Sequence, residues 1–386
     1  MSGTRTAVTR RLARAAVWSA LAGIGCSNGA PDASANGDAP VGTVEAAPAG
    51  ERSWMPAAPR LHHTHLNTLD ADAAIAWYRT VWPSGGRGEL AGHPAFMTDV
   101  PVLFTEVDAP PPGGWDDRLR RAAPQSAFWH IGAFVNTTDL FEDLLSRGVD
   151  VLRLFVGPDG DARVLRSGQT PYEGTRTAAQ LDSLGAAAGV SEARPGGFGY
   201  LVGPDGALVE MTGGPTTTAS FSHVHLFHEQ PVCAAEWYVE HLGMTLPPPR
   251  EGAPSAEATD WTAADCATAD RGEPGWPSLE AVGTIRSPRA TIVFDGGSIG
   301  FYARQCDRAR CGTDAALVPS RGQVLDHVAF EVADLDGFAD HLRGAGIPTE
   351  GPYAFGETRA LMVVGPDGLS IELVEGSGPE GRPRGR

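Results

Sequence analysis

The sequence predicts an α+β fold of two tandem domains, each made of two similar strand–helix–strand modules. Three observations predict it: an internal repeat, alternating strands that lead into amphipathic helices, and short β-rich segments joined by turns. The repeat has a constant offset of 160 residues. It aligns His63 with His223, His65 with His225, Trp77 with Trp237 and Tyr78 with Tyr238.

The repeat also sets the predicted domain boundaries. The segment "GYLVGPDGALVEM" at 199–211 matches "MVVGPDGLSIELV" at 362–374, and "FWHIGAFV" resembles "LDHVAFEV". We therefore predict a first domain at residues 60–214 and a second at 219–376.

Each half contains two modules, so the pattern of a strand, a helix and further strands occurs four times. In the first module, "HTHLNT" alternates as a strand does, and Asp70 is the expected N-cap of the next helix. The two "GPDG" segments are typical of turns between strands, and we expect no catalytic role for them. The first helix has one apolar face at helical spacing, made of Ala74, Trp77, Tyr78, Val81 and Trp82.

The N-terminus has the pattern of an export signal at residues 1–26. A basic region precedes the apolar run "AAVWSALAGIG", which is shorter than the roughly twenty residues that cross a bilayer. The run ends at Cys26 and resembles a bacterial lipoprotein signal, in which this cysteine is lipidated. We expect export to the cell envelope or periplasm, with membrane contact only through a lipid at Cys26. Residues 27–59 and 377–386 are predicted to be a disordered tether and tail.

Four further cysteines fit an oxidising compartment. Cys306 and Cys311 have a spacing compatible with a disulfide that closes a hairpin, and Cys233 and Cys266 are candidates for a second one. Free buried thiols are the alternative.

The net charge of −17 argues against nucleic acid or an anionic membrane surface as a partner. The sequence has no nucleophile elbow, phosphate-binding loop or dinucleotide fingerprint. These chemistries are therefore set aside.

The order of strands and helices, together with the recurring histidines and glutamates, resembles the vicinal oxygen chelate superfamily. That family includes glyoxalase I, extradiol dioxygenases, methylmalonyl-CoA epimerase and bleomycin-binding proteins. The resemblance implies two tandem glyoxalase-like domains, in each of which two βαβββ modules pair around a divalent metal. It also implies one histidine ligand on the opening strand of each module, and a glutamate on the last strand of the second.

Applied half by half, the resemblance implies one ligand set of His63, His130 and Glu210 and another of His223, His327 and Glu372. Glyoxalase-type sites have a fourth ligand, usually glutamate, on the last strand of the first module. The matching positions in this chain are predicted to be Phe104 and Gly300, which cannot bind a metal. A three-ligand site is therefore expected, with the second-half set as the better candidate.

Two imidazoles and one carboxylate leave neighbouring coordination positions open, so a substrate can chelate through two adjacent oxygens. We expect Fe(II), with Mn(II), Zn(II) or Ni(II) as alternatives, and a dioxygenase-like enzyme. A glyoxalase-type lyase or an epimerase, and a non-catalytic protein that binds a small molecule or drug, remain open.

Other histidines are assigned by their position. His65, His225 and His228 are candidates for proton transfer beside the metal, or else for outer-shell or rim residues. Two long segments, Gly157–Gly197 and Arg250–Ser287, are candidates for lids or disorder. No role is expected for the histidines that look like surface or helix residues: His62, His93, His241 and His341.

Overall fold

The computed structural model describes most of both repeat halves, and all its described residues belong to one unit, Ala33–Arg386. The predicted signal, the tail, Arg250–Ser287 and most of Gly157–Gly197 lie outside the described residues. Cys233 is disulfide-bonded, and its predicted partner Cys266 lies outside as well. So do the other three cysteines: Cys26, Cys306 and Cys311. The described residues are 54–55, 57–116, 121–135, 143–144, 146–147, 149, 151–156, 162–166, 191–192, 198–213, 219–246, 289–294, 297–303 and 316–376.

The end of the predicted tether is ordered, which corrects its predicted disorder up to residue 59. Trp54 stacks on His341 with ring centroids 3.9 Å apart, and it meets Phe338 edge to face at 4.9 Å. Met55 is buried in the hydrophobic core. These two apolar side chains bury enough surface to attach this stretch to the fold.

The first and fourth modules each have a complete βαβββ order. The first consists of β1 (Arg60–Thr68), α1 (Ala71–Val81), β2 (Gly86–Leu90), β3 (His93–Met97) and β4 (Val102–Glu106). The fourth consists of β16 (Leu325–Val332), α8 (Leu335–Gly344), β17 (Thr349–Phe355), β18 (Thr358–Val364), the 3-10 turn η5 (Pro366–Gly368) and β19 (Ser370–Glu375).

The second and third modules follow the same order with additions or parts outside the described residues. The second has β7 (Phe128–Val135), β8 (Val151–Val156), β9 (Ala162–Arg166), β10 (Ser191–Glu192), β11 (Phe198–Val202), the 3-10 turn η3 (Pro204–Gly206) and β12 (Leu208–Gly213). The third has β13 (Ser220–His228), α4 (Pro231–Leu242), β14 (Arg289–Phe294) and β15 (Gly297–Ala303). A small hairpin of β5 (Trp115–Asp116) and β6 (Arg121–Ala122) precedes β7.

Local signals explain where the helices begin and end. Asp70 caps α1, as predicted, because its carboxylate accepts the backbone N–H of Ala73 at 2.9 Å. Asp334 caps α8 in the same way. Helix α4 starts at Pro231 and ends at Gly243, whose φ of 67° favours glycine. Of the predicted face of α1, Ala74, Tyr78, Val81 and Trp82 are buried, and Trp77 packs against the core.

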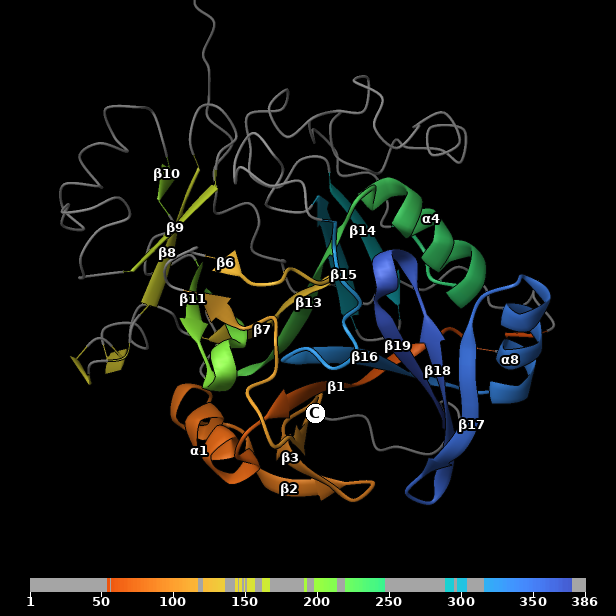
Figure 1. The fold of residues 1–386 in the computed structure, drawn as a ribbon, viewed down its shortest axis with the longest axis horizontal. Coiled ribbons are helices and arrows are strands. Elements are labelled where there is room, and N and C mark those ends of the chain that lie inside the picture. Colours follow the sequence, from red (N-terminus) through yellow and green to blue (C-terminus); the bar gives the residue numbers. More distant parts are fainter. Residues whose placement is uncertain are drawn as a thin grey trace, which may run out of the picture. The chain divides into compact units, whose positions relative to one another are not determined.

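Two mixed sheets confirm the α+β class, but each sheet takes one module from each half of the chain. The first has the order β17-β18-β19-β16-β1-β4-β3-β2, and β1 pairs antiparallel with β16 (Figure 1). The second has the order β10-β8-β11-β12-β7-β13-β15-β14, and β7 pairs antiparallel with β13. The first module therefore pairs with the fourth, and the second with the third. The predicted domains 60–214 and 219–376 each contribute one module to each sheet, so they are not the units that share a sheet.

Two equivalent contacts tie one sheet to the other. At the end of β1, Thr68 donates its hydroxyl to Asp205 of η3 at 2.6 Å. At the equivalent end of β13, His228 lies 3.0 Å from Asp367 of η5. Both "GPDG" segments thus form turns, and both aspartates have a positive φ of 55°. Their carboxylates fix the strand ends in addition to making the turn.

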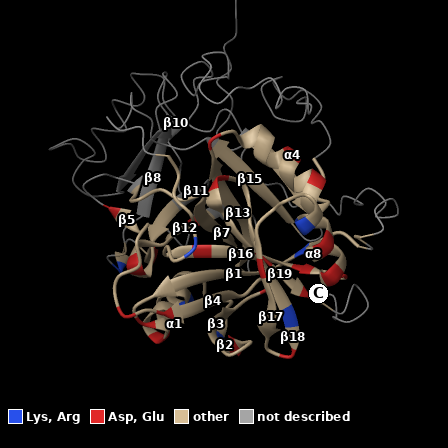
Figure 2. Cartoon of the chain, turned by 45° about the vertical axis from the view of Figure 1, so that its right-hand side comes forward, with Lys and Arg blue, Asp and Glu red and all other residues tan. Residues whose placement is uncertain are grey.

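A continuous apolar core joins the modules. Leu66 of β1 and Val328 of β16 belong to the same buried cluster as Ile131 of β7 and Val224 of β13. Acidic side chains predominate over basic ones on the described chain (Figure 2). Among the described residues, none of the helices has the length and apolar character needed to cross a membrane.

Candidate metal centres

Two buried groups of histidine and glutamate lie where the opening strands of paired modules meet. We define cluster A as His63, His65, His327 and Glu372, and cluster B as His130, Glu210, His223 and His225. All eight side chains belong to residues at most 6% exposed. The donor atoms of all four cluster B residues lie within 4.8 Å of one another, as do those of the three histidines of cluster A.

The predicted grouping of ligands by halves is wrong. His63 lies with His327 and Glu372, and His223 lies with His130 and Glu210. The reason is the strand pairing: β1 lies against β16, which brings His65 opposite His327, and β13 lies against β7. Residue spacing along the chain is the same for either pairing, so spacing alone does not reveal it.

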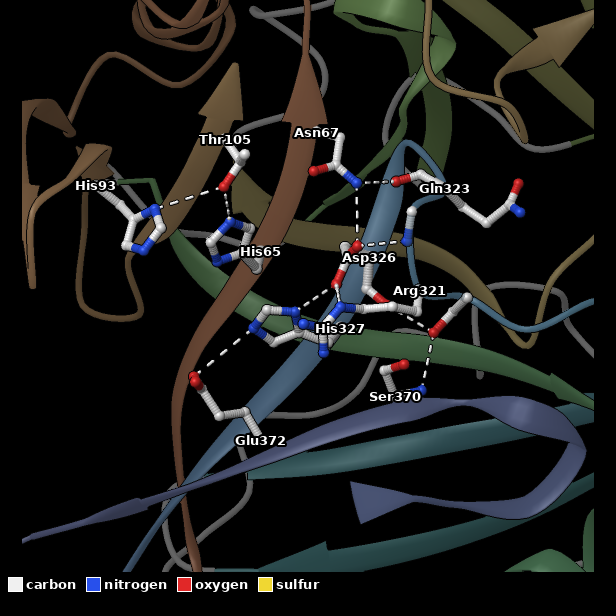
Figure 3. A network of polar contacts seen from close by, with 12 residues as sticks. His65, Asn67, His93, Thr105, Arg321, Gln323, Asp326, His327, Ser370 and Glu372 are labelled. Atoms are coloured by element: carbon white, nitrogen blue, oxygen red, sulfur yellow. Dashed lines mark hydrogen bonds and ion pairs between the residues drawn. The ribbon is translucent and has the colours of Figure 1, made fainter. Parts of the chain in front are cut away.

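In cluster A, three donor atoms converge without hydrogen bonds. Glu372 Oε2 lies 3.2 Å from His63 Nε2 and 3.7 Å from His327 Nε2. All three atoms are buried, and none has a hydrogen-bond partner, so these close approaches are not aligned as hydrogen bonds. Buried polar atoms rarely stay unsatisfied without a functional reason. Figure 3 shows Glu372 facing His327. The other oxygen of Glu372 accepts the hydroxyl of Tyr353 at 2.6 Å, which fixes the carboxylate.

β-Bulges place a polar neighbour beside three of the four cluster histidines that open a module: His63, His223 and His327. Adjacent residues normally face opposite sides of a strand, but a bulge re-aims one of them. Register shifts occur next to His62, Ser222 and Asp326. Each of these residues contacts Nδ1 of the following histidine, at 2.8, 2.8 and 2.6 Å respectively. A partner at Nδ1 fixes the tautomer and leaves Nε2 directed at the cluster.

Of these three Nδ1 partners, that of His327 is a carboxylate, Asp326. Asp326 also accepts hydrogen bonds from the backbone N–H of Gly322 and from Asn67, so its position is fixed (Figure 3). Although burial alone would lower it, the pKa of His327 is raised by Asp326 and Glu372. This is the carboxylate–histidine arrangement that raises the basicity of metal-bound imidazoles.

The remaining protonation states of cluster A also favour cation binding. Burial lowers the pKa of His63 to about 4, against the opposing effect of Glu372. Burial likewise holds the pKa of His65 well below its usual value. Although burial alone would raise it, the pKa of Glu372 is lowered by His327 and His63. Neutral imidazoles beside an ionised carboxylate are the forms that bind a divalent metal.

Cluster B has the same residue types as cluster A, three histidines and one glutamate, but an aromatic side chain lies beside them. Glu210 Oε2 lies 3.0 Å from His130 Nε2 and 3.8 Å from both His223 Nε2 and His225 Nδ1. Burial alone would raise the pKa of Glu210, but the neighbouring His130 and His223 lower it well below its usual value. Trp129 occupies the position equivalent to Asp326 and meets the His130 ring edge to face at 4.3 Å.

Both clusters fit a divalent transition metal. Donor atoms bound to one ion at about 2.1 Å lie roughly 3 Å apart when adjacent and about 4.2 Å apart across the ion. The measured separations of 3.0 to 3.8 Å between glutamate and histidine atoms lie in that range. Nitrogen and carboxylate donors suit iron, nickel, zinc or manganese and do not single out one metal.

The position of the missing fourth carboxylate needs one correction. Glu372 of β19 pairs with Ala329, which lies two residues after His327. In the first module, the residue two after His63 is His65, so the counterpart of Glu372 is the β4 residue that pairs with His65. That residue is Leu103, not Phe104, whose ring packs in the helix-side core near Tyr78. In the other sheet Gly300 pairs with His225, as expected. Leu103 and Gly300 cannot bind a metal, so the absence of this carboxylate stands.

The other histidines divide between the clusters and the rest of the fold. His65 and His225 are in the clusters, whereas His228 is held by Asp367 outside both. Sequence reasoning missed His62, which is buried against His63, and His93, whose ring lies 4.9 Å from that of His65. His241 and His341 lie on α4 and α8, 3.4 Å apart between ring nitrogens, and belong to neither cluster. The signal that could have found His62 is that a polar residue directly precedes His63, His223 and His327.

Each pair of modules has adjacent opening strands and one His–His–Glu group, as the resemblance implied for a pair, although the paired modules come from different halves. The chain has the vicinal oxygen chelate fold. Neither the known family models nor the curated proteins include a match to this chain.

Solved structures with similar folds share little sequence with this chain. Glyoxalase I from Zea mays is 14% identical, with a TM-score of 0.48, and the match covers 82% of this chain and 92% of that one. A lactoylglutathione lyase from Agrobacterium tumefaciens is 13% identical over 42% of this chain and 97% of its own, with a TM-score of 0.24. A glyoxalase/dioxygenase from Nostoc punctiforme is 18% identical over 40% and 88%, with a TM-score of 0.25.

Proposed function

We propose that this protein is a divalent-metal-dependent enzyme that acts on a small molecule through two neighbouring oxygen atoms. The observation that carries the proposal is the convergence of His63 Nε2, His327 Nε2 and Glu372 Oε2, three buried donor atoms without hydrogen-bond partners. Leaving these three buried polar atoms unsatisfied costs about 1–3 kcal/mol each. Packing of the apolar core alone therefore does not explain why they converge on one point.

A bound divalent ion would supply Lewis acidity, polarising two adjacent substrate oxygens and stabilising negative charge as it develops. The chain's own groups hold the geometry. Asp326 keeps His327 in one tautomer, Tyr353 fixes one oxygen of Glu372, and Phe355 stacks on the His63 ring at 5.4 Å. Burial of the cluster excludes water, which strengthens every electrostatic interaction in it.

Two reaction types are compatible with this centre. Leu103 and Gly300 in place of a fourth carboxylate favour a dioxygenase-like reaction, since an open position is then left for O₂. The third histidine in each cluster favours an O₂-independent proton transfer, as in a glyoxalase-type lyase or an isomerase, because it brings a further donor to the centre. Both reaction types require a bound divalent metal.

The test is a metal-loading and turnover experiment on the full chain. Protein reconstituted separately with Fe(II), Ni(II), Zn(II) and Mn(II) is assayed with catechols in an oxygen electrode, and anaerobically with thiohemiacetals of α-oxoaldehydes. We expect turnover in one arm, abolished by His63→Ala and by Glu372→Ala if cluster A is the working site. Tight binding of these compounds without turnover, unchanged in both variants, would instead indicate a non-catalytic binding protein.

A further inference from the structure

Each cluster holds a third imidazole next to the strand position that would carry the fourth carboxylate of the fold. Gly300 marks this space in cluster B, because a Cβ atom added there would lie 2.8 Å from His225 Cδ2 and 2.9 Å from its Nε2. In cluster A, His65 lies directly beside Leu103 across the β1–β4 pair. In each cluster, therefore, a histidine lies beside the strand position where the fourth carboxylate would be.

Both third histidines are held by a hydroxyl group on their far side. His65 Nε2 lies 2.7 Å from the hydroxyl of Thr105, and His225 Nε2 lies 3.4 Å from that of Tyr302. Thr105 and Tyr302 occupy equivalent positions, since each follows by two residues the strand partner of its histidine. This recurrence fixes Nε2 outward and leaves Nδ1 for the cluster.

The inward nitrogen of His225 is within reach of an imidazole and the carboxylate, and a ring nitrogen of His65 is within reach of the two other imidazoles. His225 Nδ1 lies 3.0 Å from His130 Nε2 and 3.8 Å from Glu210 Oε2, separations that adjacent ligands of one ion have. His65 offers a ring nitrogen within 4.8 Å of those of His63 and His327, and its ring lies 4.6 Å from that of His327.

We propose that His65 and His225 are themselves metal ligands, so that each centre binds its ion with three imidazoles and one carboxylate. This inference rests on the proposed metal-dependent function and narrows it. Four protein donors around a six-coordinate ion leave two positions. A substrate that chelates through two oxygens fills both, and none is left for O₂. The reaction class is therefore proton transfer on a chelated substrate, not oxygen insertion.

The first experiment counts ligands in the intact protein. The full chain is loaded with Co(II), and X-ray absorption measures the number of imidazoles for each ion. Because both centres are predicted to have the same donor set, the average must be three imidazoles per cobalt. An average of two would overturn the inference while leaving the proposed function intact. Failure to bind any metal would instead refute the proposed function.

A variant series separates a ligand from a positioning residue. His65→Ala and His225→Ala should each lower the Co(II) affinity of one centre by more than about 100-fold and reduce its imidazole count by one. The matched controls Thr105→Val and Tyr302→Phe remove only the outer hydroxyl. They should weaken binding by the roughly 10- to 100-fold typical of outer partners, with the count unchanged. Unaltered affinity in both alanine variants would contradict the assignment.

Discussion

At the scale of single residues, the decisive feature is the residue that contacts each of the histidines proposed as ligands. The sequence shows the histidines but not the bulges, because a bulge depends on how two strands pair. His62 was therefore assigned to the surface, although it lies buried at the Nδ1 atom of His63. The acidic neighbour at Asp326 and the aromatic neighbour at Trp129 make the two centres chemically different despite identical donors.

The role of Asp326 gives a prediction for metal affinity. Asp326→Asn keeps the size of the side chain but removes the charge that raises the pKa of His327, so cluster A should bind metal about 10- to 100-fold more weakly. Titration with a competing chelator measures both centres in one sample, and cluster B serves as an internal reference. The exposed Asp336→Asn is the control, and an equal loss at both centres would contradict this role.

Burial of His63 gives a prediction for pH dependence. Its folded pKa of about 4 lies below the unfolded value of 6.5, so the unfolded chain takes up a proton first as the pH falls. His63 should therefore cost the metal-free protein about 3 kcal/mol of unfolding free energy between pH 6.5 and pH 4. Denaturant unfolding of chelator-treated protein should show a shallower decline for His63→Gln than for wild type. Parallel pH profiles for the two proteins would refute the assignment.

At the scale of elements, sequence patterns located the strands and helices well. The alternation in "HTHLNT", the cap at Asp70 and the turn residues of "GPDG" all act locally, so each is readable without knowledge of the fold. His228 shares a strand with His223 and His225, which favours a place beside the metal, but the structure puts it outside both clusters. Its contact with Asp367 comes from a module that lies far along the chain.

The two inter-sheet ties should contribute measurably to stability. Asp205→Ala leaves the Thr68 hydroxyl and the Leu69 N–H without their shared acceptor and should lower the free energy of unfolding by about 2 kcal/mol. Asp340→Ala, which removes an exposed carboxylate, should change it by less than about 0.5 kcal/mol. Urea unfolding measures both variants. His228→Gln should be destabilised like Asp205→Ala yet keep its full metal content, and loss of a metal ion would contradict the structural role.

At the scale of the whole molecule, the first module pairs with the last, and the two middle modules pair with each other. The fold class and the four modules were predictable from the sequence, because they depend on repeats and local periodicity. The six histidines and glutamates predicted as ligands all lie in clusters A and B. Module pairing was not predictable, because long-range strand partners leave no mark on spacing within each strand. The predicted ligand sets were consequently grouped by halves. In the structure, His63 lies beside Glu372 and His223 beside Glu210.

The most direct test of the crossed assembly is the metal content of two double variants of the full chain. If each centre draws on both halves, His63→Ala combined with Glu372→Ala removes one centre, and elemental analysis should find half the wild-type metal. His63→Ala combined with Glu210→Ala disables both centres, so almost no metal should remain. Contradiction would be the reverse pattern, with half the metal retained in the His63–Glu210 variant and none in the His63–Glu372 variant.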